Sequence, residues 1–204
     1  MLAQATIERL PIADNTIDLI FTDPPYPKEY LSCYKWLANE AMRVLKPGGF
    51  VLAMAGGMYL NKIYRMFDES GLSYFWEYYH YSNGDRPVIW PRGTVAPIKP
   101  IICYRKGDGD LIHWNVLGVF ESSRFDKRYH HWGQDVESSR YYVDCFSRPD
   151  DLVLDPFVGG GTTAVACALI GRRFVGMDND YEDALVVTKE RLLNSDVHEQ
   201  EKMF

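Results

Sequence analysis

The sequence predicts an α/β fold with a doubly wound, mainly parallel sheet. Two observations support this prediction: strand-like and helix-like segments alternate along the 204 residues, and two of the predicted strands end in turns rich in Asp, Pro and Gly. Such alternation builds a sheet with helices on both faces, and ligands bind at the carboxyl ends of its strands. We therefore expect the two turns to face one crevice.

The individual elements follow from periodicity and from helix-stopping residues. Leu31, Tyr34 and Leu37 begin a set of apolar residues at helical spacing, and Lys46-Pro47-Gly48-Gly49 ends that helix. In chain order the prediction is a strand over 17–22, a helix over 29–46, a strand over 50–55, a helix over 58–70, two strands over 73–81 and 98–105 that lie antiparallel at the sheet edge, an irregular stretch over 107–134, a helix over 135–147, a strand over 152–154, a helix over 162–170, a strand over 173–177 and a helix over 181–194.

Composition agrees with a single domain over residues 1–204. A chain of this length buries a sizeable core without metals or disulfides, and a hydrophobic content of 47% is ordinary. The four cysteines (Cys33, Cys103, Cys145 and Cys167) are widely spaced, which indicates buried reduced thiols and no metal site. Neither a signal-peptide layout nor a run near the ~18–20 apolar residues of a membrane span is present, so a cytoplasmic protein without membrane contact is expected.

Charge is unevenly distributed along the chain. The formal net charge is −6 and the isoelectric point about 5.4, which is not typical of a nucleic-acid binder. Residues 86–131, however, carry eight basic and four acidic side chains, whereas residues 177–204 carry eight acidic and three basic ones. The basic middle suits contacts with phosphates, and the alternative is charge scattered over the surface.

The tetrapeptide Asp23-Pro24-Pro25-Tyr26 directly follows the predicted strand 17–22. The exocyclic amine of adenine or cytosine is a poor nucleophile because its lone pair is delocalised into the ring. A carboxylate and a backbone carbonyl that accept its two hydrogens localise that lone pair toward an incoming methyl group. The prolines stiffen the turn that aims the Pro24 carbonyl, and an aromatic ring offers an extruded base a stacking surface. The alternative is a structural turn, with Asp23 as a cap and Tyr26 as packing.

A glycine-rich motif, DPFVGGGTT over residues 155–163, follows the predicted strand 152–154. Gly159 and Gly161 allow a tight turn and the close approach of a ligand. No Lys follows the glycines, and Ala164 stands where a dinucleotide motif has its third glycine, so a phosphate-binding loop is not indicated.

Asp178 directly follows the next predicted strand, 173–177. An acidic residue there is placed to bind the two hydroxyls of a ribose. The ligand that best fits the glycine turn and this acid together is an adenosine without phosphate, S-adenosylmethionine.

With both motifs in this order, the chain resembles the DNA amino-methyltransferases that modify adenine N6 or cytosine N4. It resembles in particular their permuted beta group, in which DPPY precedes the glycine motif, and the resemblance covers most of residues 15–192. It implies the class I methyltransferase fold, which is Rossmann-like and here circularly permuted. It also implies S-adenosylmethionine as cofactor and DNA as partner, without a metal.

The resemblance also implies roles for individual residues. In the resembling family the equivalent of loop 84–92 lines the pocket of a flipped base; the alternative is a merely structural loop. Independently of the resemblance, aromatic residues interleaved with basic ones over 110–132 suit contact with bases and backbone, and the alternative is the packing of a small subdomain. The expected catalytic residues are Asp23, Pro24, Pro25 and Tyr26. The expected cofactor-binding residues are Asp155, Phe157, Gly159, Gly161, Thr162, Thr163, Asp178, Asn179 and Gln134. The expected nucleic-acid-binding residues are Arg86, Trp90, Arg92, Arg124, Lys127 and Arg128.

The chain departs from the family pattern in two places. His131-Trp132-Gly133-Gln134 resembles a cofactor-flanking segment that commonly reads HPTQKP, but Asp135-Val136 replaces its Lys-Pro. Residues 107–130 form a small irregular insertion and are all that remains for a target-recognition region. Recognition is therefore short and degenerate, or a second subunit completes it in a homodimer.

The predicted function is methylation of adenine N6 in DNA. The preference for adenine rests on Asp23, because enzymes of the cytosine N4 type more often carry Ser at that position. The alternatives are a cytosine N4 DNA methyltransferase, an RNA adenine N6 methyltransferase that acts on an unstacked base, and a catalytically inactive nucleic-acid-binding subunit.

Overall fold

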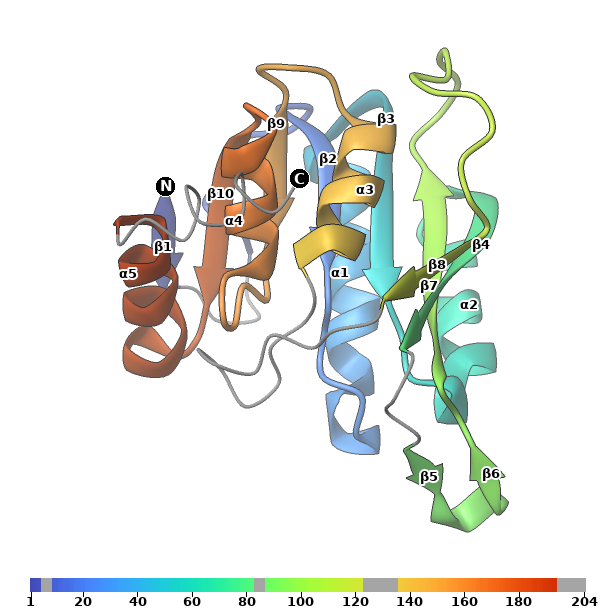
Figure 1. The fold of residues 1–204 in the computed structure, drawn as a ribbon. Coiled ribbons are helices and arrows are strands. Elements are labelled where there is room, and N and C mark those ends of the chain that lie inside the picture. The colour runs from blue at the N-terminus through green and yellow to red at the C-terminus, as the bar shows by residue number, and fades with distance from the viewer. Residues whose placement is uncertain (5–8, 83–86, 123–135, 194–204) are drawn as a thin grey trace.

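The computed structural model describes residues 1–4, 9–82, 87–122 and 136–193. An eight-stranded sheet lies at its centre, with helices on both faces (Figure 1). The strands of this sheet are β1 (Leu2–Gln4), β2 (Ile17–Thr22), β3 (Leu45–Met54), β4 (Ser73–Ser82), β7 (Ile98–Arg105), β8 (Val119–Ser122), β9 (Leu152–Asp155) and β10 (Arg173–Asp178). The helices are α1 (Leu31–Val44), α2 (Leu60–Asp68), α3 (Val136–Phe146), α4 (Thr162–Leu169) and α5 (Val187–Leu193), the last preceded by a π-helical segment, Tyr181–Val186.

The strands follow the order β1-β10-β9-β2-β3-β7-β4-β8. Every neighbouring pair is parallel except the two made by β7, which runs antiparallel to both β3 and β4. The order reverses between β9 and β2, because β10 follows β9 toward one edge and β3 follows β2 toward the other. Such a switch point opens a crevice at the carboxyl ends of the two strands.

Alternation along β2 divides the core into two layers. Ile20 packs in the layer under α1 and α2, together with Leu37 and Phe67. Leu19 and Phe21 pack in the other layer, which α3 and α4 cover. Side chains of a parallel strand buried on both faces read as a continuous apolar run, which is how residues 19–21 read in the sequence.

A small antiparallel hairpin, β5 (Val88–Ile89) and β6 (Thr94–Val95), stands apart from the main sheet. A 3₁₀ turn, Trp90–Arg92, forms its tip. The chain passes from β6 almost directly into β7, which is antiparallel to β3, so the hairpin lies beyond the carboxyl end of β3. In Figure 1 it projects below the sheet, away from the body of the domain.

The fold class predicted from the sequence is confirmed, with differences of detail. β8 lies within the stretch expected to be irregular and pairs in parallel with β4, so the antiparallel strand β7 is interior. The sequence does not predict β1 or the β5–β6 hairpin, because two or three residues carry too little periodicity. The last helix begins as a π-helical segment.

The structure also bears on the expectations for the cysteines, for membrane-spanning helices and for metal sites. Cys33, Cys103 and Cys167 are buried free thiols, as expected, and Cys145 is a half-buried one. No helix in the described part of the chain is long and apolar enough to cross a membrane, and no cluster of His, Cys, Asp and Glu there could hold a metal ion.

Candidate active site

One cavity of about 780 Å³ opens at the switch point between β9 and β2. Its walls come from residues 23–27 after β2, from residues 155–160 with Thr162 and Thr163 after β9, and from Asp178 and Asn179 at the end of β10. The structure therefore brings the two sequence motifs together. Side chains that the sequence analysis did not single out complete the wall: Leu10, Phe21, Tyr30, Cys33, Trp36, Met54, Lys99 and Ser139.

The DPPY turn presents a carboxylate to this cavity. The Tyr26 hydroxyl donates a hydrogen bond to Asp23 Oδ1. Lys99 Nζ lies 3.4 Å from Asp23 Oδ2 and 5.1 Å from the centroid of the Tyr26 ring. Asp23 and Lys99 are each a little over a quarter exposed, so the three groups form a half-buried cluster at the cavity wall.

The Pro24 carbonyl is held from behind by a buried tyrosine. Tyr34, on α1, is 1% exposed, and its hydroxyl lies 3.3 Å from the Pro24 carbonyl oxygen and 3.1 Å from that of Met54. The single hydroxyl hydrogen is shared between two acceptors, and a carbonyl oxygen has two lone pairs. The Pro24 carbonyl can therefore accept a second hydrogen bond.

Gly56 makes room for the Tyr26 ring. A Cβ at residue 56 would lie 3.0 Å from Tyr26 Cβ and 3.2 Å from Cγ. Gly56 stands in no recognisable motif, so the sequence does not predict its part in the site; only the close approach seen in the structure explains it.

Asp155 ties the two motifs together from inside the protein. Asp155 is only 3% exposed. Its two carboxylate oxygens accept hydrogen bonds from Thr22 Oγ1 and Thr163 Oγ1, each at 2.6 Å, and from the Phe157 amide at 3.1 Å. Burial raises the pKa of Asp155 to about 6, and these donors limit the rise. Because Thr22 directly precedes Asp23, this carboxylate fixes the DPPY turn to the glycine turn.

The glycine turn depends on close packing against α5. Gly161 has a φ of +77°, and a Cβ there would lie 2.6 Å from Thr188 Oγ1. Thr188 Oγ1 also donates to the Gly159 carbonyl at 3.1 Å, and the Arg191 guanidinium donates to the Gly160 carbonyl. A side chain at Gly161 would both strain the backbone and push α5 away.

Asp178 lies where the sequence predicts, facing the glycine turn. Its Oδ2 accepts a hydrogen bond from the Gly159 amide and its Oδ1 one from the Asp180 amide, both at 3.0 Å. Asp178 and Asn179 line the cavity, whereas Asp180 does not. Phe157, which also lines the cavity, meets Trp36 of α1 edge-on, with ring centroids 5.7 Å apart.

Of the remaining predicted residues that the structure describes, Gly161, Trp90 and Arg92 do not line the cavity. Trp90 and Arg92 lie exposed on the β5–β6 hairpin, and Trp90 is 83% exposed. Four expected nucleic-acid contacts and one expected cofactor contact lie outside the described residues: Arg86, Arg124, Lys127, Arg128 and Gln134. The cofactor-flanking segment 131–134 lies outside them as well.

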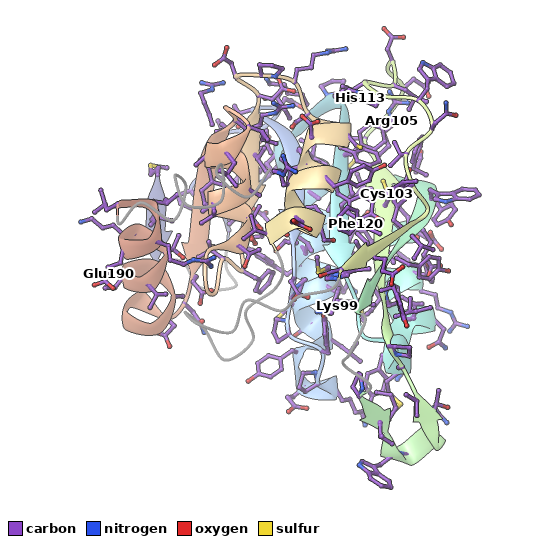
Figure 2. The ribbon with its side chains drawn as sticks, viewed as in Figure 1. Lys99, Cys103, Arg105, His113, Phe120 and Glu190 are labelled. Atoms are coloured by element: carbon purple, nitrogen blue, oxygen red, sulfur yellow. The ribbon has the colours of Figure 1, made fainter. Side chains whose placement is uncertain are left out.

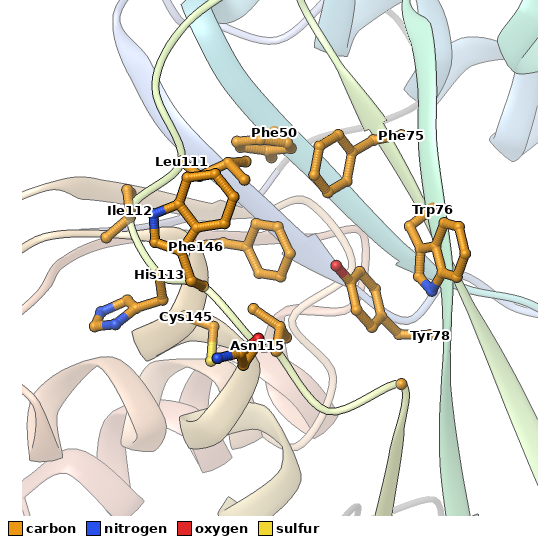
Figure 3. Close-up of a pocket in the computed structure, with 13 residues that line it drawn as sticks. Phe50, Phe75, Trp76, Tyr78, Leu111, Ile112, His113, Asn115, Cys145 and Phe146 are labelled. Carbon is orange, nitrogen blue, oxygen red and sulfur yellow. The ribbon is translucent and has the colours of Figure 1, made fainter.

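A second cavity, of about 400 Å³, lies between the sheet and residues 111–118 (Figure 3). Aromatic and aliphatic side chains dominate its wall, including Phe50, Tyr78 and Phe146, and no Asp, Glu, Lys or Arg among the described residues contributes to it. It therefore offers no carboxylate to polarise a substrate.

Comparison with known proteins now identifies the family. The sequence model of a family described as DNA methylase matches residues 113–188. The type II methyltransferase M2.LlaDCHI of Lactococcus lactis subsp. cremoris is 46% identical over an alignment that covers 89% of this chain and 84% of the relative.

The chain belongs to the DNA methylase family. A more distant relative, the type II methyltransferase M.HindIII of Haemophilus influenzae, is 24% identical over 78% of this methylase and 68% of the relative.

Solved structures show the same fold. A DNA modification methylase of Thermus thermophilus, TTHA0409, in complex with S-adenosyl-L-methionine, has a TM-score of 0.74 at 20% identity and covers 90% of this methylase and 88% of that chain. The PvuII DNA methyltransferase, which is cytosine-N4-specific, has a TM-score of 0.76 at 18% identity, with 94% and 84% covered. At these identities the likeness is one of fold.

Proposed function

We propose that this methylase transfers a methyl group from S-adenosylmethionine to the N6 amine of adenine in DNA. The observation that carries the proposal is the shared cavity, which residues 23–27 and residues 155–160 both line. Family membership supplies the general activity, DNA methylation. The side chains of the cavity support the cofactor and the chemistry.

The glycine turn and the end of β10 fit S-adenosylmethionine. Asp178 offers its carboxylate to the ribose hydroxyls, with Asn179 and Phe157 on the same cavity wall. Gly159 and Gly161 shape the turn, and Asp155 holds it through the hydroxyl of Thr163. Among the described residues that line the cavity, Lys99 is the single basic one, which suits a nucleoside without phosphate.

When bound, S-adenosylmethionine supplies a methyl group already activated by its sulfonium. The task left to the protein is therefore to hold the amine and stabilise developing charge. Asp23 and the Pro24 carbonyl accept the two amine hydrogens, and Pro25 keeps the turn rigid. Tyr34 fixes the direction of the Pro24 carbonyl without using both of its lone pairs.

Tyr26 has two roles in the proposed reaction. Its ring stacks on the extruded base, and its hydroxyl occupies Asp23 until the amine arrives. An incoming amine competes with that hydroxyl for the carboxylate, so an Asp23 oxygen is hydrogen-bonded in either state.

Adenine is preferred over cytosine because residue 23 is an aspartate. In the family that the motifs resemble, enzymes of the cytosine N4 type more often carry Ser there. Cytosine N4 and the adenine of an RNA remain the rival substrates, and both are outcomes of the first test below.

DNA contact is assigned to the β5–β6 hairpin. It projects past the carboxyl end of β3, the same end of the sheet at which the cavity opens (Figure 1). Trp90 at its tip is exposed, and Arg92 beside it carries a positive charge suited to phosphate. Arg86, Arg124, Lys127 and Arg128 extend the proposed contact from segments outside the described residues.

The first prediction tests the reaction itself. Unmethylated genomic DNA treated with this methylase and S-adenosylmethionine, then digested to nucleosides for mass spectrometry, should contain N6-methyldeoxyadenosine. Asp23→Ala should lower the yield by ~10²-fold or more, because the acceptor of the amine is lost. Cofactor affinity, followed by isothermal titration, should stay within a few-fold. Asp110→Ala, at an exposed acid outside the cavity, is the matched control.

Three results would contradict this assignment. N4-methyldeoxycytidine as the product would show that cytosine is the substrate. Methylation of a matched RNA but not of DNA would show that RNA is the substrate. Activity of Asp23→Ala above about a tenth of wild type would remove Asp23 from the proposed role.

The second prediction concerns the ribose contact. Asp178→Ala should raise the dissociation constant of S-adenosylmethionine roughly 10- to 100-fold, since charge-assisted hydrogen bonds are worth ~1.5–3 kcal/mol. The rate at saturating cofactor should change little, because the ribose is held alike in ground and transition states. Asp180→Ala, two residues on and outside the cavity wall, should bind the cofactor normally. The reverse pattern would show that the ribose contact is made by Asp180.

The third prediction concerns the hairpin. Trp90→Ala should weaken DNA binding about tenfold, the size expected from the loss of one stacking contact, and leave S-adenosylmethionine binding unchanged. Trp76→Ala is the matched control, because Trp76 is 56% exposed but lies on β4 and lines the second cavity. Fluorescence anisotropy with a labelled duplex measures both variants. Equal weakening by the two changes would leave the hairpin without a specific part in DNA binding.

A further inference from the structure

Lys99 is the one basic side chain among the described residues of the cavity wall, and no sequence motif points to it. It is the second residue of β7, the strand that runs antiparallel to β3. The beginning of β7 therefore reaches the carboxyl ends of the parallel strands, where the DPPY turn lies. Figure 2 shows Lys99 at the opposite end of this strand from Arg105.

The Lys99 ammonium and the Asp23 carboxylate lie side by side, with Nζ 3.4 Å from Oδ2. An ammonium has three hydrogens to donate and a carboxylate only accepts, so the pair presents one donor next to one acceptor. The ammonium also lies 5.1 Å from the centroid of the Tyr26 ring. A base that stacks on this ring and gives its amine to Asp23 therefore meets Lys99 at the same edge.

The edge of adenine that carries its amine has the complementary pattern. The N6 amine donates and the neighbouring ring nitrogen N1 accepts. Guanine and thymine present a carbonyl acceptor next to an N–H donor instead, which would set carbonyl against carboxylate and N–H against ammonium. Buried groups left unpaired in this way give strong discrimination against the wrong base.

Resting on the proposed function, we infer that Lys99 donates a hydrogen bond to N1 of the flipped adenine while Asp23 accepts from N6. Lys99 is thus a specificity residue that reads the ring nitrogen beside the reactive amine. A DNA phosphate is a poorer occupant of this position, because it would lie against the carboxylate of Asp23. The half-buried position of Lys99, with its side chain 28% exposed, also favours a base edge over the open backbone.

The test removes the acceptor from the substrate and the donor from the protein. The substrates are two duplexes that carry the target sequence, mapped first from methylated genomic DNA; one has adenine at the target position and the other 1-deazaadenine, which keeps the amine but has C–H in place of N1. The proteins are wild type, Lys99→Met and Lys99→Arg. Lys62→Met is the matched control, because exposed Lys62 also lies over a tyrosine ring, that of Tyr59 at 5.8 Å, but outside the cavity wall. Single-turnover methyl transfer at saturating cofactor is measured for each pair.

Wild type and Lys62→Met should methylate the deaza duplex roughly 10- to 100-fold more slowly than the adenine duplex. Lys99→Met should be slow on both duplexes and distinguish them by less than about threefold. Lys99→Arg, which keeps a donor, should recover part of the discrimination. The effect of the analogue on the reactivity of the amine is common to all four proteins and cancels in this comparison.

Equal discrimination by wild type and Lys99→Met would overturn the inference and leave Lys99 as a support for Asp23 alone. Absence of discrimination by wild type would overturn it as well. Failure of the proposed function looks different: wild type would then give no methyladenine on the unmodified duplex, before any variant is compared.

Discussion

The buried carboxylate of Asp155 is the constraint on which the rest of the site depends. The backbone ladder between β2 and β9 pairs Leu19 with Val153 and Ile20 with Leu154, and the hydrogen bond from Thr22 to Asp155 continues the connection beyond it. A carboxylate that is almost fully buried is costly unless its oxygens are hydrogen-bonded. The raised pKa of Asp155 reflects that cost, and its donors from both halves of the domain offset it. The two turns are therefore fixed relative to each other where they form one cavity.

Each half then supports its own wall of the cavity. Tyr34 and Gly56 set the position of the DPPY turn from behind, and α5 does the same for the glycine turn through Thr188. The edge-on contact of Trp36 with Phe157 adds an apolar connection between the halves. Proteins hold reacting groups most accurately when rigid elements and supporting hydrogen bonds fix them, so the methyl donor and the amine meet in a geometry that the chain itself determines.

The fold class and the meeting of the two motifs are predictable from the sequence, because both motifs end strands of an alternating α/β pattern and such ends converge. Asp178 is predictable for the same reason. Lys99, Tyr34 and Gly56 are not, since each reaches the site from outside the two motifs and no motif assigns it a part there. The hydrogen bonds of Asp155 are not predictable either: the sequence assigns this residue to the cofactor, and the structure shows that its oxygens also accept from three donors of the chain. Its contact with the cofactor stays a prediction.

The most direct test of the part of Asp155 is the rate of methyl transfer by the Thr22→Val variant, with the Thr163→Val variant as its counterpart. Valine keeps the shape of threonine but removes the hydroxyl that reaches Asp155. A hydrogen bond to a charged group is worth about 1.5–3 kcal/mol. We therefore expect Thr22→Val to slow single-turnover transfer at saturating S-adenosylmethionine and DNA about tenfold, with cofactor affinity within about twofold of wild type. Thr163→Val, on the glycine turn, should mainly weaken the cofactor. Transfer by Thr22→Val at the wild-type rate would contradict the claim that Asp155 sets the geometry of the site.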